Sequence, residues 1–255
     1  MSAKLQVHIA NDERKKVMVV GHERSGTHFL MNTLALNFGY VARPWINFDF
    51  DLGINFHAPQ AVRDFFVQMH GKPVLNIVKS HHPYGFFSEV IDEIHDEFHV
   101  FYILRDPRDV MVSYWLCIRE LPWDEGPRAD TVGEFMRAAP RGAVMRYQKE
   151  QVPNMLARWK AHVDSWIHDA PTIVRNNLIV IRYEDLNSNY RLVVSRIGEH
   201  LGIHCATPVR PNTTDNVVLP GKGEIGGHRQ YFTADDHAFV QDVAGETIQS
   251  LELVR

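Results

Sequence analysis

Short apolar runs rich in β-branched residues alternate along the chain with longer segments in which apolar residues recur every three or four positions. A run of about four to eight such residues is typical of a buried strand, whereas the longer period is that of an amphipathic helix. The strands predicted in this way are 17–20, 74–79, 99–104 and 178–182. The predicted helices are 25–38, 58–70, 86–94, 106–118, 153–167 and 190–201. Their alternation predicts an α/β fold with a central parallel sheet flanked by helices.

Three stretches between these elements show neither period, namely 43–57, 120–142 and 207–230. Long loops of an α/β protein commonly face a ligand, although they can also be plain surface. The 255 residues, 45% of them hydrophobic, can bury one sizeable core. We therefore expect a single domain over residues 1–255.

Charge and cysteine content limit the classes of function. The formal net charge of −4 gives no bulk electrostatic reason to expect a nucleic-acid partner. Cys117 and Cys205 form neither a disulfide framework nor a CxxC pair, which favours a reducing compartment. The opening residues lack the apolar core of a signal peptide, and no stretch approaches the roughly 18 apolar residues of a membrane span. We therefore expect a cytoplasmic protein.

Residues 21–28, GHERSGTH, follow the first predicted strand and open the first predicted helix. Gly21 and Gly26 have the spacing of the glycines in a P-loop, G-x-x-x-x-G-K-[ST]. Thr27 and His28 replace its lysine and its magnesium-binding hydroxyl. Backbone N–H groups between a strand and a helix still bind an anion, whatever the side chains are. We interpret the segment as an anion-binding loop that works without magnesium.

The loop itself carries basic and hydroxyl side chains. Arg24 supplies a cation three residues before the position of the missing lysine, and Ser25 and Thr27 add hydroxyl donors. A second cluster, FYILRDPRDVMVSYW, places Arg105 at the end of a predicted strand and Ser113 two turns into the next helix. Open α/β sheets bind their ligands at this carboxyl edge of the strands. Arg105 and Ser113 are therefore predicted to bind a second anionic group.

Other charged residues of the second cluster are expected to be structural. Asp106 stands where a helix N-cap is needed, directly before Pro107. Arg108 and Asp109 are expected to form a solvent-exposed pair. Neither Arg108 nor Asp109 is therefore predicted to belong to the anion-binding site.

The two clusters resemble the nucleotide-binding motifs of PAPS-dependent sulfotransferases. GHERSGTHF is similar to the family's 5′-phosphosulfate loop, commonly YPKSGTTW, with Arg24 for the lysine, as in tyrosylprotein sulfotransferases, and Phe29 for a tryptophan that stacks on adenine. LRDPRDVMVSY is similar to the 3′-phosphate motif, an arginine followed eight positions later by a serine. The resemblance covers roughly residues 17–233. It implies a P-loop-like fold, PAPS (3′-phosphoadenosine 5′-phosphosulfate) as sulfuryl donor, PAP as product and no catalytic metal.

A further segment extends the resemblance to the reacting groups. NIVKSHHP is similar to the K-T-H-x-P segment of cytosolic sulfotransferases, with Lys79 and His81 at its lysine and histidine. The resemblance implies that His81 is the catalytic base. The acid–base chemistry of histidine supports this role, because a histidine with a pKa of about 6.5 can take the proton of an attacking hydroxyl. Arg24 and Lys79 can stabilise the charge that develops on the sulfuryl oxygens.

The resemblance also assigns residues around the adenosine. IRYEDL is similar to the family's YEDL-type segment, whose tyrosine borders adenine, which implies Tyr183. In GKGEIGGHRQYFT, Lys222 and Gly223 match the R-K-G loop at the 3′-phosphate, whereas Gly221 replaces its arginine and His228 a usual tryptophan. The predicted cofactor-binding residues are Arg24, Ser25, Gly26, Thr27, His28, Phe29, Arg105, Ser113, Tyr183, Lys222 and Gly223.

Alternatives stay open at this point. A P-loop kinase would share the sheet and the anion loop, and a non-catalytic PAP- or PAPS-binding module would keep Arg105 and Ser113 without needing a base. The acceptor could be a sugar or glycan, a phenol, a lipid or a peptide tyrosine, and the oligomeric state is undefined. His95 and His99 have a zinc-like spacing but cross from a helix to a strand, so no metal site is predicted.

Overall fold

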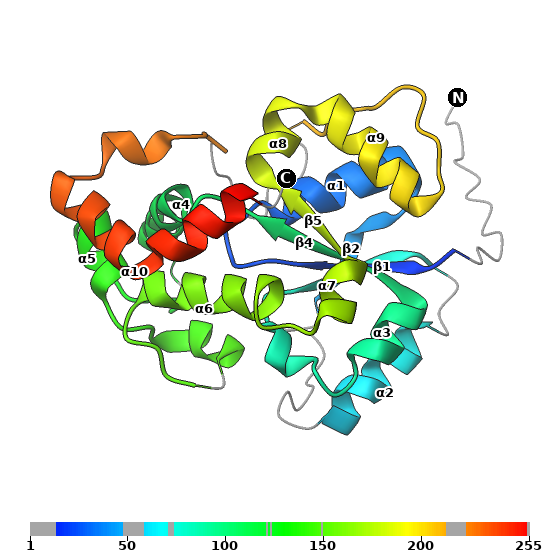
Figure 1. Ribbon diagram of the computed structural model, residues 1–255, viewed down its shortest axis with the longest axis horizontal. Coiled ribbons are helices and arrows are strands. Elements are labelled where there is room, and N and C mark those ends of the chain that lie inside the picture. The colour runs from blue at the N-terminus through cyan, green and yellow to red at the C-terminus, as the bar shows by residue number, and fades with distance from the viewer. Residues whose placement is uncertain are drawn as a thin grey trace.

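A five-stranded parallel sheet runs through the middle of the described part of the chain (Figure 1). The computed structural model describes residues 14–47, 59–70, 74–120, 122, 124–148, 150–212 and 223–253. The strands are β1 Lys16–Val20, β2 Val41–Asn47, β3 Asn76–Ser80, β4 Phe98–Leu104 and β5 Leu178–Arg182. Their order is β2-β3-β1-β4-β5, and every neighbouring pair is parallel. The predicted α/β fold is thus confirmed.

Helices cover both faces of this sheet. The α-helices are α1 Thr27–Phe38, α2 Pro59–His70, α3 Ile91–Glu97, α4 Pro107–Glu120, α5 Val132–Arg137, α6 Met155–Ile167, α7 Thr172–Asn177, α8 Tyr183–Ser188, α9 Tyr190–Leu201 and α10 Ala234–Leu253. The 3₁₀ helices are η1 Tyr84–Phe86, η2 Gly142–Tyr147 and η3 Gly227–Gln230. Helices α1, α8 and α9 lie on one side of the sheet, and α2, α3 and α6 lie on the other (Figure 1).

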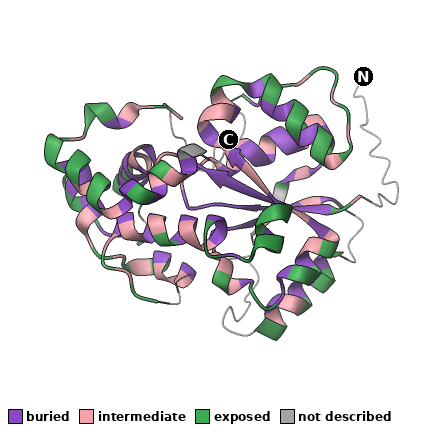
Figure 2. Cartoon of the chain, viewed as in Figure 1, coloured by how far each residue is buried: buried purple, intermediate pink, exposed green. Residues whose placement is uncertain are grey.

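The strands contribute side chains to two apolar cores, because successive side chains point to opposite faces of the sheet. In β1, Val17 and Val19 belong to the core beneath α1 and α9, whereas Met18 and Val20 belong to the larger core on the opposite face. Every residue of β1 is buried, as expected for a central strand covered on both sides (Figure 2).

The carboxyl ends of β1, β3, β4 and β5 lie along one edge of the sheet. Val20 pairs with both Ser80 and Tyr102, and Leu104 pairs with Arg182. The loops after β1, β3 and β4 therefore lie side by side with the start of α8. Strand β3 lies on one side of β1 and strand β4 on the other, so the strand order reverses at the carboxyl end of β1. Open α/β sheets bind their ligands at such a position.

Several elements differ from the prediction, and α7, α8 and α10 lie where no helix was predicted. β2 overlaps the first irregular stretch and lies at the edge of the sheet, where Pro44 is tolerated and the register shifts between Val41 and Ile46. Only residues 91–94 of the helix predicted at 86–94 lie in an α-helix, α3, because the backbone N–H groups of Phe87 and Val90 bond to carbonyl oxygens three residues earlier, which is the 3₁₀ pattern. Helix α5 and η3 occupy parts of the other two irregular stretches.

Candidate active site

The loop between β1 and α1 requires glycine at two positions. A Cβ atom at Gly21 would lie 2.7 Å from the carbonyl oxygen of Ile103, and one at Gly26 would lie 2.4 Å from the ring of Tyr183. Gly26 has φ 101°, and Arg24 also adopts the left-handed region with φ 67°. No side chain caps α1 at Gly26. The positive end of the α1 dipole therefore lies at the end of the loop, where an anion can bind.

The two basic motifs meet at this loop. Nε of Arg24 donates to Oγ of Ser113 over 3.0 Å, and Nη1 of Arg105 donates to the carbonyl oxygen of Arg24 over 3.1 Å. Burial, together with the nearby charge of Arg105, lowers the pKa of Arg24 from its ordinary value. Ser25 and Thr27 are buried in the same loop. Groups predicted to bind two different anions thus lie in direct contact.

Arg105 connects the loop to the C-terminal part of the chain. Its side chain is buried, Nη2 donates to the carbonyl oxygen of Glu224 over 2.9 Å, and Cζ lies 4.5 Å from the centre of the Tyr183 ring. The Tyr183 hydroxyl donates to the carbonyl oxygen of Gly223 over 2.7 Å. Nε of Arg105 is buried and has no hydrogen-bond partner among the described residues. Lys222, predicted to act beside Gly223, lies outside the described residues.

Further aromatic rings lie close to Tyr183. The ring of Phe29 lies 6.1 Å from that of Tyr183 and 6.1 Å from that of Tyr190, measured between centres. The guanidinium of Arg210 lies 5.4 Å from the centre of the Phe29 ring. Sequence reasoning missed Tyr190, which looks like any residue at a helix start, and Arg210, which lies in an irregular stretch without a motif.

Lys79 and His81 lie at the end of β3, beside the loop. Both side chains are buried, and Nδ1 of His81 lies 2.6 Å from the carbonyl oxygen of Gly21. Because a carbonyl oxygen only accepts, Nδ1 carries the ring proton and Nε2 is the nitrogen that can take up another. The ring of Tyr147 packs edge-on against that of His81, 5.6 Å between centres.

The imidazole of His28 lies close to Lys79, His81 and Arg24. Burial and the charges of Lys79, His81 and Arg24 lower the pKa of His28 to about 3, so the ring is neutral at neutral pH. The charge of Arg43 acts in the same direction. The concentration of cationic side chains around a neutral imidazole suits an anionic ligand group.

A buried ion pair supports the loop from α6. The carboxylate of Glu23 accepts from Nη1 and Nη2 of Arg158 over 2.9 and 2.7 Å. Nη1 of Arg158 also donates to Nε2 of His22 over 2.8 Å, while Nδ1 of His22 donates to the carbonyl oxygen of Glu23 over 2.9 Å. Burial alone would raise the pKa of the Glu23 carboxyl, but the Arg158 charge holds it well below its usual value. Sequence reasoning missed this pair because its members are 135 residues apart.

His22 predicts how stability depends on pH. Burial lowers the pKa of His22 from 6.5 to about 3, so below pH 6.5 the unfolded chain takes up a proton that the folded chain does not. The contribution of the neutral His22 to the free energy of unfolding is therefore fully present above pH 6.5. It is lost as the pH drops toward 3, by roughly 1.4 kcal/mol per pH unit for one such group. Urea unfolding between pH 7.5 and 5 measures the slope.

His22→Gln keeps an acceptor for Arg158 but does not titrate, so its pH slope should be shallower than that of the wild type. His204→Gln removes an exposed histidine and should leave the slope unchanged. Equal slopes for the wild type and His22→Gln would mean that His22 does not govern this dependence.

Asp109 is not the solvent-exposed partner of Arg108 that the sequence predicts. Arg108 pairs instead with Asp106, which also accepts from the Arg108 backbone N–H over 2.8 Å, as expected of an N-cap. Asp109 is only 3% exposed and accepts hydrogen bonds from Gly226 and His228. The prediction was wrong because these partners lie 117 and 119 residues further along the chain.

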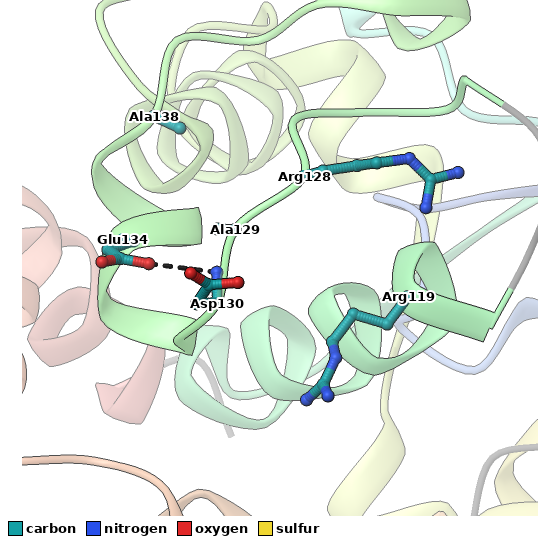
Figure 3. A pocket seen from close by; sticks show the side chains of 6 residues that line it. All are labelled: Arg119, Arg128, Ala129, Asp130, Glu134 and Ala138. Carbon is teal, nitrogen blue, oxygen red and sulfur yellow. Dashed lines mark hydrogen bonds between the residues drawn. The ribbon is translucent and has the colours of Figure 1, made fainter.

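A separate shallow pocket of about 530 Å³ lies at the end of α4 (Figure 3). Its lining residues are Arg119, Arg128, Ala129, Asp130, Glu134 and Ala138. Glu134 accepts from the backbone N–H of Asp130 over 3.0 Å and belongs to the capping box that begins α5. None of the predicted site residues lines this pocket, so we do not assign the predicted chemistry to it.

The described residues hold neither a cluster of metal-ligating side chains nor a helix suited to a membrane. No three His, Cys, Asp or Glu side chains there gather closely enough to hold a metal ion. His95 and His99 lie in α3 and β4, on different elements as the sequence predicts. None of the helices in the described ranges has both the length and the apolar character needed to cross a membrane.

Comparison with known sequences identifies relatives of this chain. The sulfotransferase domain family matches residues 14–252. Sulfotransferase 4A1 of Homo sapiens is 25% identical over 171 residues, which cover 62% of this chain and 54% of that protein. The 3-alpha-hydroxysteroid sulfotransferase of Cavia porcellus is 28% identical over 119 residues, covering 47% and 35%. The match to sulfotransferase 4A1 therefore spans about half of that relative's length.

Solved structures share the fold. Mouse sulfotransferase SULT7A1, complexed with PAP, superposes with a TM-score of 0.66 at 16% identity, covering 95% of this chain and 87% of that one. Retinol dehydratase, in a complex with retinol and PAP, superposes with a TM-score of 0.59 at 17% identity, covering 92% and 82%. Because the family match spans nearly all of the described residues, the chain belongs to the sulfotransferase domain family.

Proposed function

We propose that the protein transfers the sulfuryl group of PAPS to a hydroxyl of an acceptor and releases PAP. The contact of the two basic motifs carries this proposal, because Arg24 hydrogen-bonds Ser113 and its carbonyl oxygen binds Arg105. A nucleotide with anionic groups on both its 5′ and 3′ sides would engage both motifs at once. The matched structures that hold PAP support the same ligand.

The residues present fit such a nucleotide. Backbone N–H groups at the start of α1, with Arg24, would hold the 5′ side. The buried Nε of Arg105, which has no partner among the described residues, is a donor suited to a phosphate oxygen, and Ser113 can add a hydroxyl. Phe29 and Tyr183 provide the aromatic surface expected beside adenine.

The same residues suggest how the reaction proceeds. PAPS, when bound, supplies an activated sulfuryl group. His81 would take the proton of the acceptor hydroxyl on Nε2, while the carbonyl oxygen of Gly21 holds the ring through Nδ1–H. Lys79 and Arg24 would stabilise the negative charge on the sulfuryl oxygens and on the departing phosphate. The acceptor oxygen bonds to sulfur as the bond from sulfur to the phosphate oxygen breaks.

A small molecule is the acceptor class that the relatives favour. One matched relative is named a 3-alpha-hydroxysteroid sulfotransferase, and one matched structure holds retinol. We propose a hydroxyl-bearing small molecule for this chain as well, with a glycan as the alternative. The cytoplasmic location, inferred from the use of Cys117 and Cys205, stays a prediction.

Calorimetric titration with PAP, and separately with ADP and Mg²⁺, tests the proposal. Binding of PAP without metal, and weak or no binding of MgADP, is expected. A preference for MgADP would favour a kinase instead. Tight PAP binding without turnover over a broad acceptor panel would favour a non-catalytic binding module.

Arg105→Ala should weaken PAP binding by about 1.5–3 kcal/mol, or roughly 10- to 150-fold in Kd, because a charged hydrogen-bond donor is lost. Calorimetry measures the change. Arg175→Ala removes an exposed arginine on α7 and serves as the matched control, which should bind PAP like the wild type. Wild-type affinity in Arg105→Ala would show that Arg105 does not contact the nucleotide.

A further inference from the structure

Residues 223–228 lie against the start of α4 and are held there by a buried carboxylate. Oδ2 of Asp109 accepts from the backbone N–H of Gly226 over 2.7 Å. Oδ1 accepts from both the backbone N–H and Nδ1 of His228, over 3.1 and 2.8 Å. Asp109 is 3% exposed and His228 is 4% exposed, so both side chains are taken out of water.

These contacts are strong enough to define the position of the 223–228 segment. A buried carboxylate is costly unless donors satisfy it, and here both of its oxygens are satisfied by that one segment. Burial alone would raise the pKa of Asp109, but the hydrogen bonds from Gly226 and His228 and the charge of Arg105 lower it overall. Asp109 is therefore ionised and accepts from all three donors at neutral pH.

The same segment is what Arg105 and Tyr183 contact. Arg105 donates through Nη2 to the carbonyl oxygen of Glu224, and Tyr183 donates to that of Gly223. Gly223 and Gly226 both have positive φ, 62° and 76°, which lets the backbone turn back toward these donors. The orientation of the Arg105 guanidinium thus depends on where the 223–228 segment lies.

We infer that Asp109 and His228 form a latch that positions the 223–228 segment against Arg105, and that Asp109 thereby sets the preference for a nucleotide carrying a 3′-phosphate. The inference rests on the proposed function. Asp109 is a positioning residue in this account, because it acts through the segment and through Arg105. His228 stands where the related motif has a tryptophan, so the hydrogen bond from Nδ1 belongs to this chain's own version of the loop.

Asp109→Asn separates the latch from a simple charge effect. Loss of a carboxylate near Arg105 would by itself make the site more positive and tighten the binding of an anion. The latch predicts the opposite, because an asparagine cannot accept from all three donors. The test compares PAP with AMP, which lacks only the 3′-phosphate, by calorimetry.

For Asp109→Asn we expect roughly tenfold or greater weakening of PAP binding and an AMP affinity within about twofold of the wild type. Asp235→Asn, which removes an exposed carboxylate, is the matched control and should change neither affinity. Unchanged or tighter PAP binding in Asp109→Asn would overturn the latch. Parallel loss of PAP and AMP binding would also overturn it, since that pattern reports general unfolding.

Variants of His228 test the same contact from the other side. His228→Phe keeps a ring to pack against Phe232 but has no donor, so it should weaken PAP selectively. His228→Asn places an amide N–H near the position of Nδ1 and should recover much of the lost affinity. Equal PAP affinities for these two variants would contradict the role of the hydrogen bond. A wild-type protein that binds no PAP would instead overturn the proposed function itself, and the latch with it.

Discussion

Replacing His81 with alanine is expected to lower kcat by about 10²–10⁴-fold while leaving the Kd for PAP within about twofold of the wild type. The reason is the geometry of the ring, which is held through Nδ1 by the carbonyl oxygen of Gly21 and so presents Nε2 for proton uptake. A base contributes to the transition state and little to nucleotide binding. Turnover of PAPS with a responsive acceptor, together with PAP calorimetry, measures both quantities.

The control for this variant is His204→Ala, which removes an exposed histidine outside every predicted motif. It should keep both turnover and PAP affinity. Wild-type turnover in His81→Ala would show that another group takes the proton. A matching loss of PAP affinity would indicate that His81 acts mainly in binding.

Replacing Arg158 with methionine is expected to lower the free energy of unfolding by about 3–5 kcal/mol. The variant leaves the Glu23 carboxylate buried without the guanidinium that now binds both of its oxygens, and it removes the donor to His22. Urea unfolding at pH 7.5 measures the change. Because the pair holds the β1–α1 loop, PAP affinity should fall as well.

The double variant Glu23→Leu/Arg158→Met removes the unpaired charge and should recover much of the lost stability. Arg63→Met is the matched control, since its pair with Glu93 is partly exposed, 35% and 52% for the two side chains, and should contribute about 0–1 kcal/mol. An Arg158→Met variant no less stable than Arg63→Met would mean that the buried pair does not stabilise the loop.

Local patterns were enough to predict most of the sheet and the two basic motifs. Val17–Val20 is a continuous apolar run, which is the sequence pattern of a strand buried on both faces, and its residues alternate between the two cores. The meeting of Arg24 with Ser113 follows from parallel strands, whose carboxyl ends share one edge. The family resemblance that these motifs carry is confirmed by the match over residues 14–252.

Features that depend on distant partners were not predictable in this way. The local sequence predicts that Asp109 is a surface residue. It is buried because the 223–228 segment, more than a hundred residues later in the chain, packs against it. Glu23 and Arg158 each occupy a position with ordinary local chemistry, and only tertiary packing turns them into a buried pair. β2 was missed for a different reason, because Pro44 argues against a strand unless the strand is known to lie at an edge.

The central place of β1 has a consequence for the nascent chain. β1 is the first of the described strands to be synthesised, yet its hydrogen-bonding partners are β3 and β4. At about 5–20 residues per second, the stretch from Val20 to Leu104 takes several seconds to leave the ribosome. Both edges of β1 stay unpaired until β3 has been made, and the second edge stays unpaired until β4 follows, so the apolar run of β1 is exposed to wrong pairing during translation.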